Sequence, residues 1–410
     1  MSDLFSDQSY WHRTSEQPPS TRDAMPDAAD VVVVGGGLLG VATSYWLARG
    51  GAAVVLLERD RLAAGATGRN GGFMVAGTAE SYPAAIARVG HADARAVLQL
   101  TLDNRALLRG MLADEQIDCD YREVGNLHLA LHEQQFSEMA HAVEIGRADG
   151  YMADVLDRAA VQKLVHTPLG PEIVGGVFAE GNGTLHSARL VYGLAQAAQR
   201  HGASVYTNIE VKSISSDGGG VHVETSGGAM RAGAVVVAVN AWTNQLLPQL
   251  AGVVTPVRGQ MLAYEPCAPV FSTGMAAELT PTGEYWQQTP DGTIVLGGCR
   301  AVAPDGEVGM RELGAHNAVQ AALDGVLPRL FPALAGLRVG QRWAGPMAFT
   351  PDRMPIADAV PGLPGVWVVG GFSGHGMPFG LTLGRLLAAA ARGERSMELA
   401  PFRLDRPSLS

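Results

Sequence analysis

A glycine-rich turn between a strand and a helix constrains this chain more than any other feature. The run VVVVGGGLLG begins with four valines at 31–34 and leads into a segment with helical spacing of apolar residues. Gly35, Gly37 and Gly40 match the pattern GxGxxG. The first glycine allows the tight turn, the second lets a diphosphate approach the backbone, and the third lets the helix pack closely on the strand. The pattern predicts an anion site at the start of the helix, where Leu38 and Leu39 lie.

An acidic residue ends the next predicted strand. Residues 53–57 read AVVLL and are followed by Glu58 and Arg59. Strand, helix and strand within ~30 residues form a βαβ unit with parallel strands. A carboxylate at this separation is placed to accept hydrogen bonds from a ribose hydroxyl. The combination predicts a dinucleotide-binding unit, and the alternative is a tight turn followed by a surface carboxylate.

The composition narrows the class of protein and of partner. The chain has 410 residues, of which 47% are hydrophobic and 17% charged, so we expect a globular protein with a large core. The net charge of −10, with no basic run, argues against a nucleic-acid partner. Cys119, Cys267 and Cys299 show no CxxC spacing, which argues against a metal site and fits a reducing cytoplasm. Glycines interrupt the apolar stretch 31–48, so no membrane partner is expected, and the N-terminus shows no signal peptide.

Two further glycine clusters favour a large planar cofactor. Residues 65–72 read GATGRNGG, and residues 370–380 read GGFSGHGMPFG between a buried strand at 366–369 and a helix at 381–392. Glycine weakens regular structure, so such stretches indicate a ligand that lies flat against the backbone. A nicotinamide enzyme has no obvious need for the second cluster, whereas the isoalloxazine ring of a flavin does. A nicotinamide dehydrogenase remains the alternative.

The chain resembles the FAD-dependent amine and amino-acid oxidase superfamily, which includes D-amino-acid oxidase, glycine oxidase and sarcosine oxidase. The resemblance covers residues 28–395. It is carried by VVVVGGGLLG with LLERD, by GATGRNGG, AVVVAVNAW, PVRGQML and TPDRMPIAD, and by GGFSGHGMPFG. The segment GRNGG, the asparagine of AVNAW and the SYW near the N-terminus are most similar to the γ-glutamylputrescine oxidase branch.

The resemblance implies an α/β fold with two parts. We expect a Rossmann-type FAD-binding domain built from discontinuous segments, and an α+β substrate domain with a large mixed or antiparallel sheet. A β-meander is predicted between residues 204 and 239, and alternating strands between 256 and 300. The expected division is an N-terminal arm (1–27), the FAD-binding domain (28–85, 155–250 and 340–410) and the substrate domain (86–154 and 251–339).

The resemblance also implies which residues hold FAD. The glycine loop at 370–380 would pass beside the pyrimidine end of the flavin, with backbone N–H groups and the start of helix 381–392 facing N1 and O2. The backbone of Val211 would hold the adenine, and Asn240 stands where relatives often have glycine, in a left-handed turn that asparagine tolerates. The expected cofactor-binding residues are Gly35, Gly37, Leu38, Leu39, Gly40, Glu58, Arg59, Thr67, Arg69, Asn70, Gly71, Gly72, Val211, Asn240, Trp242, Gly371, Gly374, His375, Gly376 and Met377.

Three departures from sarcosine oxidase bear on the chemistry. Sarcosine oxidase carries its flavin covalently on a cysteine just before this TPD stretch, whereas residues 343–352 here contain no cysteine, so we expect non-covalent FAD. Sarcosine oxidase has, two residues after its GHG, a lysine that binds the substrate carboxylate. Here Met377 and Pro378 follow Gly376, which weakens the case for simple N-methylglycine substrates. A lysine that promotes oxygen reduction in that relative is also not evident here, so the electron acceptor stays open.

The expected activity is oxidation of a C–N bond in an amine or amino acid. A hydride passes to flavin N5, the imine product is hydrolysed, and O2 is the expected acceptor, giving H2O2. The alternatives are a dehydrogenase that passes electrons to a quinone or carrier protein, and a flavoprotein subunit of a complex. Catalytic candidates are His375, Tyr285 and Gln287, although a purely structural role for His375 is the other reading. Further substrate-side candidates, each with an equal case for a structural role, are Arg258, Gln260, Trp286 and Trp343.

Overall fold

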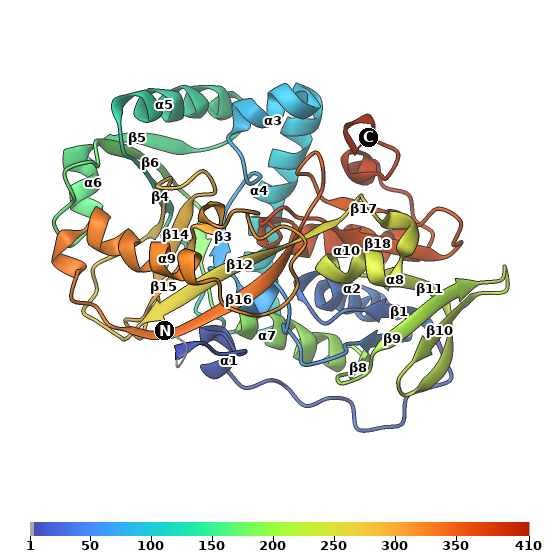
Figure 1. Ribbon diagram of the computed structural model, residues 1–410. Coiled ribbons are helices and arrows are strands. Elements are labelled where there is room, and N and C mark those ends of the chain that lie inside the picture. Colours follow the sequence, from blue (N-terminus) through green and yellow to red (C-terminus); the bar gives the residue numbers. More distant parts are fainter. Residues whose placement is uncertain (1–3, 410) are drawn as a thin grey trace.

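The computed structural model describes residues 4–409 and contains two eight-stranded β-sheets in different halves of the molecule (Figure 1). The first sheet packs with helices α2 (Leu38–Arg49), α7 (Ser187–Arg200) and α10 (Gly380–Ala391). The second lies with α5 (Glu133–Ala148), α6 (Arg158–Leu164) and α9 (Asn317–Leu330). This arrangement is the predicted α/β fold with a second sheet, and the candidate site lies where the two halves meet.

The first sheet is the predicted Rossmann-type sheet. Its strands follow the order β17-β18-β11-β1-β2-β8, with β1 parallel to both neighbours and β17 antiparallel at the edge. Strands β10 and β9 extend from β11 as an antiparallel ribbon, which confirms the predicted meander. The strands are β1 (Ala28–Val34), β2 (Val54–Leu57), β8 (Ser204–Tyr206), β9 (Val211–Ser216), β10 (Val221–Thr225), β11 (Gly228–Val237), β17 (Ile356–Ala359) and β18 (Val366–Gly370).

The four valines of β1 form a continuous apolar run because the strand is covered by protein on both faces of the sheet. Val31 and Val33 belong to the core that contains helices α2 and α10, whereas Val32 and Val34 face the core on the other side of the sheet. All four side chains are buried. A central parallel strand covered on both faces needs apolar residues at every position, because successive side chains point to opposite faces.

The second sheet has the order β16-β12-β15-β14-β13-β4-β6-β5. Strands β12 and β16 pair antiparallel from Thr255–Phe349 to Tyr264–Val339 and form the long ribbon that crosses between the halves in Figure 1. The strands are β4 (Asn126–Ala130), β5 (Ala153–Asp157), β6 (Gly175–Ala179), β12 (Thr255–Tyr264), β13 (Gly274–Ala277), β14 (Glu284–Gln288), β15 (Ile294–Gly298) and β16 (Val339–Phe349).

Two segments assigned in the expected division to the FAD-binding domain pair with strands of the second sheet. Residues 155–179 contribute to β5 and β6, which pair with β4 in the second sheet and not with the first. Strand β16 also belongs to the second sheet, because it pairs with β12 along its length. Short antiparallel strands carry no local signal for which sheet they join, since their partners are distant in sequence.

Residues 9–13 of the predicted N-terminal arm pack against the second glycine cluster. Helix α1 (Tyr10–Arg13) begins after Ser9 and buries the Trp11 side chain. The indole Nε1 of Trp11 donates a hydrogen bond to the carbonyl of Asn70 at 2.6 Å, and Ser9 Oγ donates to the carbonyl of Gly68. These contacts tie the SYW motif to the GATGRNGG loop.

The C-terminal tail holds the turn that follows β16. Arg406 donates to both carboxylate oxygens of Asp352, at 2.6 and 2.9 Å, and Ser408 Oγ donates to the same carboxylate at 2.6 Å. Arg88 on α3 (Tyr82–Val89) donates to the carbonyl of Asp352 at 3.0 Å. The turn at residues 350–354 is therefore held by hydrogen bonds both from the C-terminal tail and from α3.

The remaining regular elements are short, apart from one long helix. Helix α4 (His91–Asp114) runs beside α10, and β3 (Phe73–Met74) pairs with β7 (Gly183–Thr184). Helix α8 (Thr243–Leu246) follows the first sheet. Within residues 4–409, no helix combines the length and the apolar character needed to cross a membrane.

Candidate active site

The first glycine turn has the geometry of a phosphate cradle. Gly35 has a φ of +111°, and a Cβ there would lie 2.6 Å from the carbonyl oxygen of Ala238. At Gly40 a Cβ would lie 1.9 Å from the carbonyl oxygen of Gly35. At Gly37, by contrast, it would meet only Thr67 Oγ1, at 3.3 Å. Gly35 and Gly40 are thus required by protein packing, while Gly37 leaves open a side that faces the cavity.

The acidic end of the cavity is formed after β2. Glu58 Oε2 accepts a hydrogen bond from the N–H of Gly36 at 2.6 Å, and Oε1 accepts from Asp60 at 2.9 Å. Burial raises the pKa of Glu58, and these two N–H groups act in the opposite direction. The guanidinium carbon of Arg59 lies 4.1 Å from the centroid of the Trp242 ring. Glu58, Arg59 and Trp242 line the same cavity, at the end where β9 begins with Val211.

The second glycine loop forms the middle of the wall. Asn70 Oδ1 accepts from the N–H of Gly72 at 2.8 Å, which fixes the bend. Gly72 has a φ of +71° and lies behind the wall, where a Cβ would come within 2.3 Å of the carbonyl oxygen of Leu185. The guanidinium of Arg69 donates to the carbonyls of Ala64, Ala344 and Asp7, and burial lowers its pKa to about 10. Its charged end therefore braces the loop.

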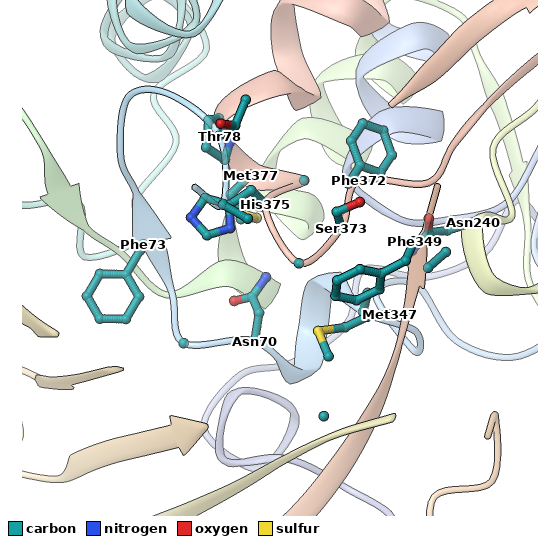
Figure 2. Close-up of a pocket in the computed structure, with 18 of the residues that line it drawn as sticks. Asn70, Phe73, Thr78, Asn240, Met347, Phe349, Phe372, Ser373, His375 and Met377 are labelled. Carbon is teal, nitrogen blue, oxygen red and sulfur yellow. The ribbon is translucent and has the colours of Figure 1, made fainter. Parts of the chain in front are cut away.

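The third glycine loop leads from β18 into α10. Gly371, Ser373 and Gly374 all have positive φ, and the N–H of Gly371 donates to Asn240 Oδ1 at 3.1 Å. Asn240 has a φ of +46°, which confirms the expected left-handed backbone at that position. Figure 2 shows His375 in the middle of this part of the cavity, with Phe73 on one side and Met347 and Phe349 on the other.

The start of α10 is occupied by a side chain that the sequence did not reveal. Asn104 on α4 accepts from the N–H groups of Leu381 and Thr382, at 2.9 and 3.0 Å. These two N–H groups of the helix N-terminus are therefore already bonded within the protein. The loop before it, at Gly374, Gly376 and Met377, lines the cavity instead.

The second sheet forms the floor of the other half of the cavity. Tyr285 on β14 meets Phe73 edge to face, with centroids 6.0 Å apart, and its hydroxyl lies 3.4 Å from Met261 Sδ. Met347 and Phe349 project from β16 into the same chamber. The walls are mainly apolar and aromatic, as expected for a chamber that holds a small organic ligand.

Two of the catalytic candidates line the cavity and one does not. Burial lowers the pKa of His375 to about 4, and its Nδ1 is buried with no hydrogen-bond partner among the described residues. Burial raises the pKa of Tyr285 to about 12. Both are therefore uncharged at neutral pH. Gln287 lies behind the wall, where its Nε2 donates to the carbonyls of Gly71 and Gly72, at 2.7 and 2.8 Å.

The other substrate-side candidates have structural positions. Trp286 is buried in the core of the second sheet, and Trp343 is buried with its Nε1 donating to the Arg69 carbonyl at 3.0 Å. Arg258 forms a buried ion pair with Glu307. Gln260 lines the cavity, but its amide oxygen accepts from Gln320 at 2.9 Å and its nitrogen donates to Glu307.

Two arginines that sequence reasoning missed also line the chamber. Arg300 follows β15, and Arg353 lies in the turn after β16. They belong to segments more than fifty residues apart, so no local pattern associates them. The positive φ of Arg353, +57°, became visible only in the structure.

One continuous cavity of about 1740 Å³ joins these parts. Pockets for drug-sized ligands measure about 300–1,000 Å³, so this one has room for a dinucleotide together with a small substrate. The open face at Gly37 and the orphaned Nδ1 of His375 fit a large cofactor that covers both. Seventeen predicted cofactor residues line it: Gly35, Gly37, Leu38, Leu39, Glu58, Arg59, Thr67, Arg69, Asn70, Gly71, Val211, Asn240, Trp242, Gly374, His375, Gly376 and Met377. Gly40, Gly72 and Gly371 lie just behind.

Comparisons with known proteins agree with this geometry. The model of the family described as FAD dependent oxidoreductase (DAO) matches residues 30–390. The γ-glutamylputrescine oxidoreductase of Escherichia coli is 29% identical over 89% of this chain and 84% of its own length. The glycine oxidase of Geobacillus kaustophilus is 25% identical over 92% of this chain and 97% of its own. Its crystal structure superposes with a TM-score of 0.81, covering 93% of this chain and 99% of that one at 24% identity.

The family match spans most of the chain, and the nucleotide cradle, the glycine loops and the aromatic chamber lie within the matched residues. This protein belongs to the DAO family of FAD-dependent oxidoreductases, which act on amines and amino acids.

Proposed function

We propose that this protein oxidises a C–N bond of an amine or amino acid with a non-covalent FAD, and that O2 reoxidises the cofactor with formation of H2O2. The observation that supports this most is the single cavity that joins the nucleotide cradle at Gly37 to the aromatic chamber around Tyr285. When bound, FAD supplies a hydride acceptor at N5. None of the three cysteines lines the cavity within residues 4–409, which favours non-covalent attachment.

The chamber favours the unprotonated form of the substrate amine. A free amine has a pKa of about 10, so most of it is protonated at neutral pH. Apolar walls such as Phe73 and Met347 disfavour an ammonium by desolvation, and the cations Arg300 and Arg353 disfavour it by repulsion. The amine nitrogen then keeps its lone pair, and that lone pair assists the departure of a hydride from the adjacent carbon. Water hydrolyses the resulting imine.

No ionised side chain is needed as a base in this scheme. His375 and Tyr285 are neutral at pH 7 because burial shifts both pKa values away from neutrality. Their work is to bind and orient the substrate, and orientation of a donor carbon against an acceptor supplies much of the rate in such reactions.

The test is anaerobic reduction of the FAD-loaded protein by a panel of amines. The names of the relatives suggest γ-glutamylputrescine and glycine as first members, with putrescine and N-methylglycine beside them. Bleaching of the flavin absorbance by at least one amine, followed by H2O2 on admission of air, is the expected result. A flavin that no member of a broad amine and amino-acid panel reduces would contradict the proposal.

A dehydrogenase is the second candidate, because the chain is poor in lysine. Its two lysines are Lys163 on α6, which does not line the cavity, and Lys212 on β9, at the Glu58 end. A reduced flavin that persists in air but is reoxidised at once by a quinone analogue would favour this candidate over the oxidase.

A further inference from the structure

We propose that Asn104 is a positioning residue for the flavin, and that its neutral side-chain amide sets the ratio of the affinities of the cavity for reduced and oxidised FAD. Asn104 lies behind the cavity wall and is not among the residues that line it, so it acts through the wall segments that it holds. The inference goes beyond the proposed function, because it concerns the cofactor and does not depend on which amine is oxidised.

Asn104 is a polar residue on the apolar face of α4. The buried positions of this helix include Val97, Leu100, Leu108 and Met111, and a hydrophobic residue would suit position 104 equally well. Asn104 is 0% exposed. A buried amide costs free energy unless its donors and acceptors are bonded, and asparagine is also a poorer helix former than leucine. The asparagine therefore does not serve the stability of α4 itself, and its role lies in what its amide contacts.

The side-chain amide of Asn104 joins three other parts of the chain. Its Oδ1 accepts from the N–H groups of Leu381 and Thr382 in α10, at 2.9 and 3.0 Å. Its Nδ2 donates to the carbonyl of Met377 and to Met74 Sδ, both at 3.3 Å. Met377 belongs to the third glycine loop, whereas Met74 on β3 directly follows the second. One amide therefore ties both loops to the long helix α4.

Asn104 also supplies the cap that α10 lacks. The residue before this helix is Phe379, which has no side-chain acceptor, and the N–H groups of a first helical turn have no partner within the helix. An aspartate at position 104 would accept from these N–H groups as well as asparagine does. It would, however, turn an oxygen toward the Met377 carbonyl. The amide suits both neighbours, because it accepts on one side and donates on the other.

The absence of charge on this cap bears on the flavin. Two-electron reduction makes a flavin more negative, and protein charges near the ring tune its reduction potential. The N-terminus of α10 carries a partial positive charge, which favours the more negative form of a nearby group. A neutral amide leaves that partial charge in place. A carboxylate would oppose it, in a buried region where salt screens little.

The experiment measures the reduction potential of the FAD-loaded protein against a reference dye and the FAD affinity of the apoprotein by fluorescence, and it needs no substrate. Asn104→Asp keeps the size of the side chain and the acceptor for α10. We expect it to weaken binding of reduced FAD about tenfold or more relative to oxidised FAD, which lowers the two-electron potential by about 30 mV or more. Asn104→Ala releases the Met377 carbonyl and should weaken binding of oxidised FAD by about tenfold, the scale of a buried hydrogen bond.

Thr101 offers a matched control on the same helix. It lies three residues before Asn104 and is also 0% exposed. Its Oγ1 accepts from the N–H of Gly77 at 2.8 Å and donates to the carbonyl of Leu98 at 2.7 Å. Thr101→Val should therefore lower the melting temperature, as Asn104→Ala does, but should leave the reduction potential unchanged.

Three results would overturn the proposal. The first is an unchanged potential in Asn104→Asp, and the second is an equal shift in Thr101→Val, since α4 would then act only through general stability. Should Asn104→Asp fail to fold, Asn104→Ser decides, because its hydroxyl keeps one donor and one acceptor and should recover part of the FAD affinity lost in Asn104→Ala. Equal affinity in these two variants is the third contrary result. If the potentials shift as expected but no amine bleaches the flavin, only the proposed function fails.

Discussion

The buried tryptophan of the N-terminal segment should couple protein stability to FAD binding. Trp11 is 1% exposed, its ring would touch a Cβ placed at Gly72, and its Nε1 donates to the Asn70 carbonyl at 2.6 Å. Trp11→Ala removes a large buried side chain, which costs about 3–5 kcal/mol of unfolding free energy. The loss includes about 1–3 kcal/mol for an Asn70 carbonyl left without its donor. Since Asn70 and Gly71 line the cavity, FAD affinity should fall as well.

The assay compares unfolding of the apoprotein and of the FAD-loaded protein in guanidinium chloride. FAD raises the free energy of unfolding by RT ln(1 + [FAD]/Kd). A larger Kd for FAD therefore reduces the difference in unfolding free energy between the FAD-loaded protein and the apoprotein. Trp11→Phe, which keeps most of the apolar volume but removes the donor, should narrow it partly. Trp46→Ala, at a partly buried position in the last turn of α2, should lower the unfolding midpoints of both forms and leave the difference between them unchanged. If Trp11→Ala behaves like Trp46→Ala, the N-terminal segment does not support the FAD loop.

Three further predictions concern the glycine turn, Glu58 and the buried histidines. Gly37→Ala should fold normally but lose FAD, whereas Gly40→Ala should have a lower free energy of unfolding, because a Cβ at Gly40 would lie 1.9 Å from a backbone oxygen. Circular dichroism and the flavin content of the purified proteins distinguish these two outcomes. Glu58→Gln should weaken FAD binding by about 10- to 100-fold, the value of a charged hydrogen bond, in fluorescence titrations of the apoprotein. Burial lowers the pKa of His12 to about 4 and of His186 to about 3 in the folded protein. As the pH drops below about 6.5, the unfolded chain therefore binds protons that the folded protein does not, and the free energy of unfolding should fall. A melting temperature that does not change between pH 7 and 5 would contradict this.

Local patterns in the sequence predicted the first sheet and the glycine turn at its edge. A strand with apolar residues at every position, the three glycines of the turn and Glu58 after β2 lie within thirty residues of one another. Each is a short-range requirement of backbone geometry. The left-handed Asn240 was predictable for the same reason, since the side chain that tolerates such a backbone is visible at the position itself.

Contacts between distant segments were beyond that reasoning. Asn104 bonds the start of α10 across nearly three hundred residues, and Gln287 reaches the second glycine loop from β14. The chemistry of both side chains is generic, so only the fold gives them a partner. Strands β5 and β6 joined the second sheet for a related reason, because pairing with β4 is decided by packing and not by their own residues.

The two ends of the chain serve different ends of the cavity. Residues 9–11 support the Asn70 loop that lines the cavity, while Arg406 and Ser408 anchor the turn that carries Arg353. Deleting the residues from Arg406 onward should therefore leave a protein that still binds FAD but has an altered substrate specificity. A tag or fusion placed there would produce the same artefact, so kinetic work calls for affinity handles that are cleaved off before assay.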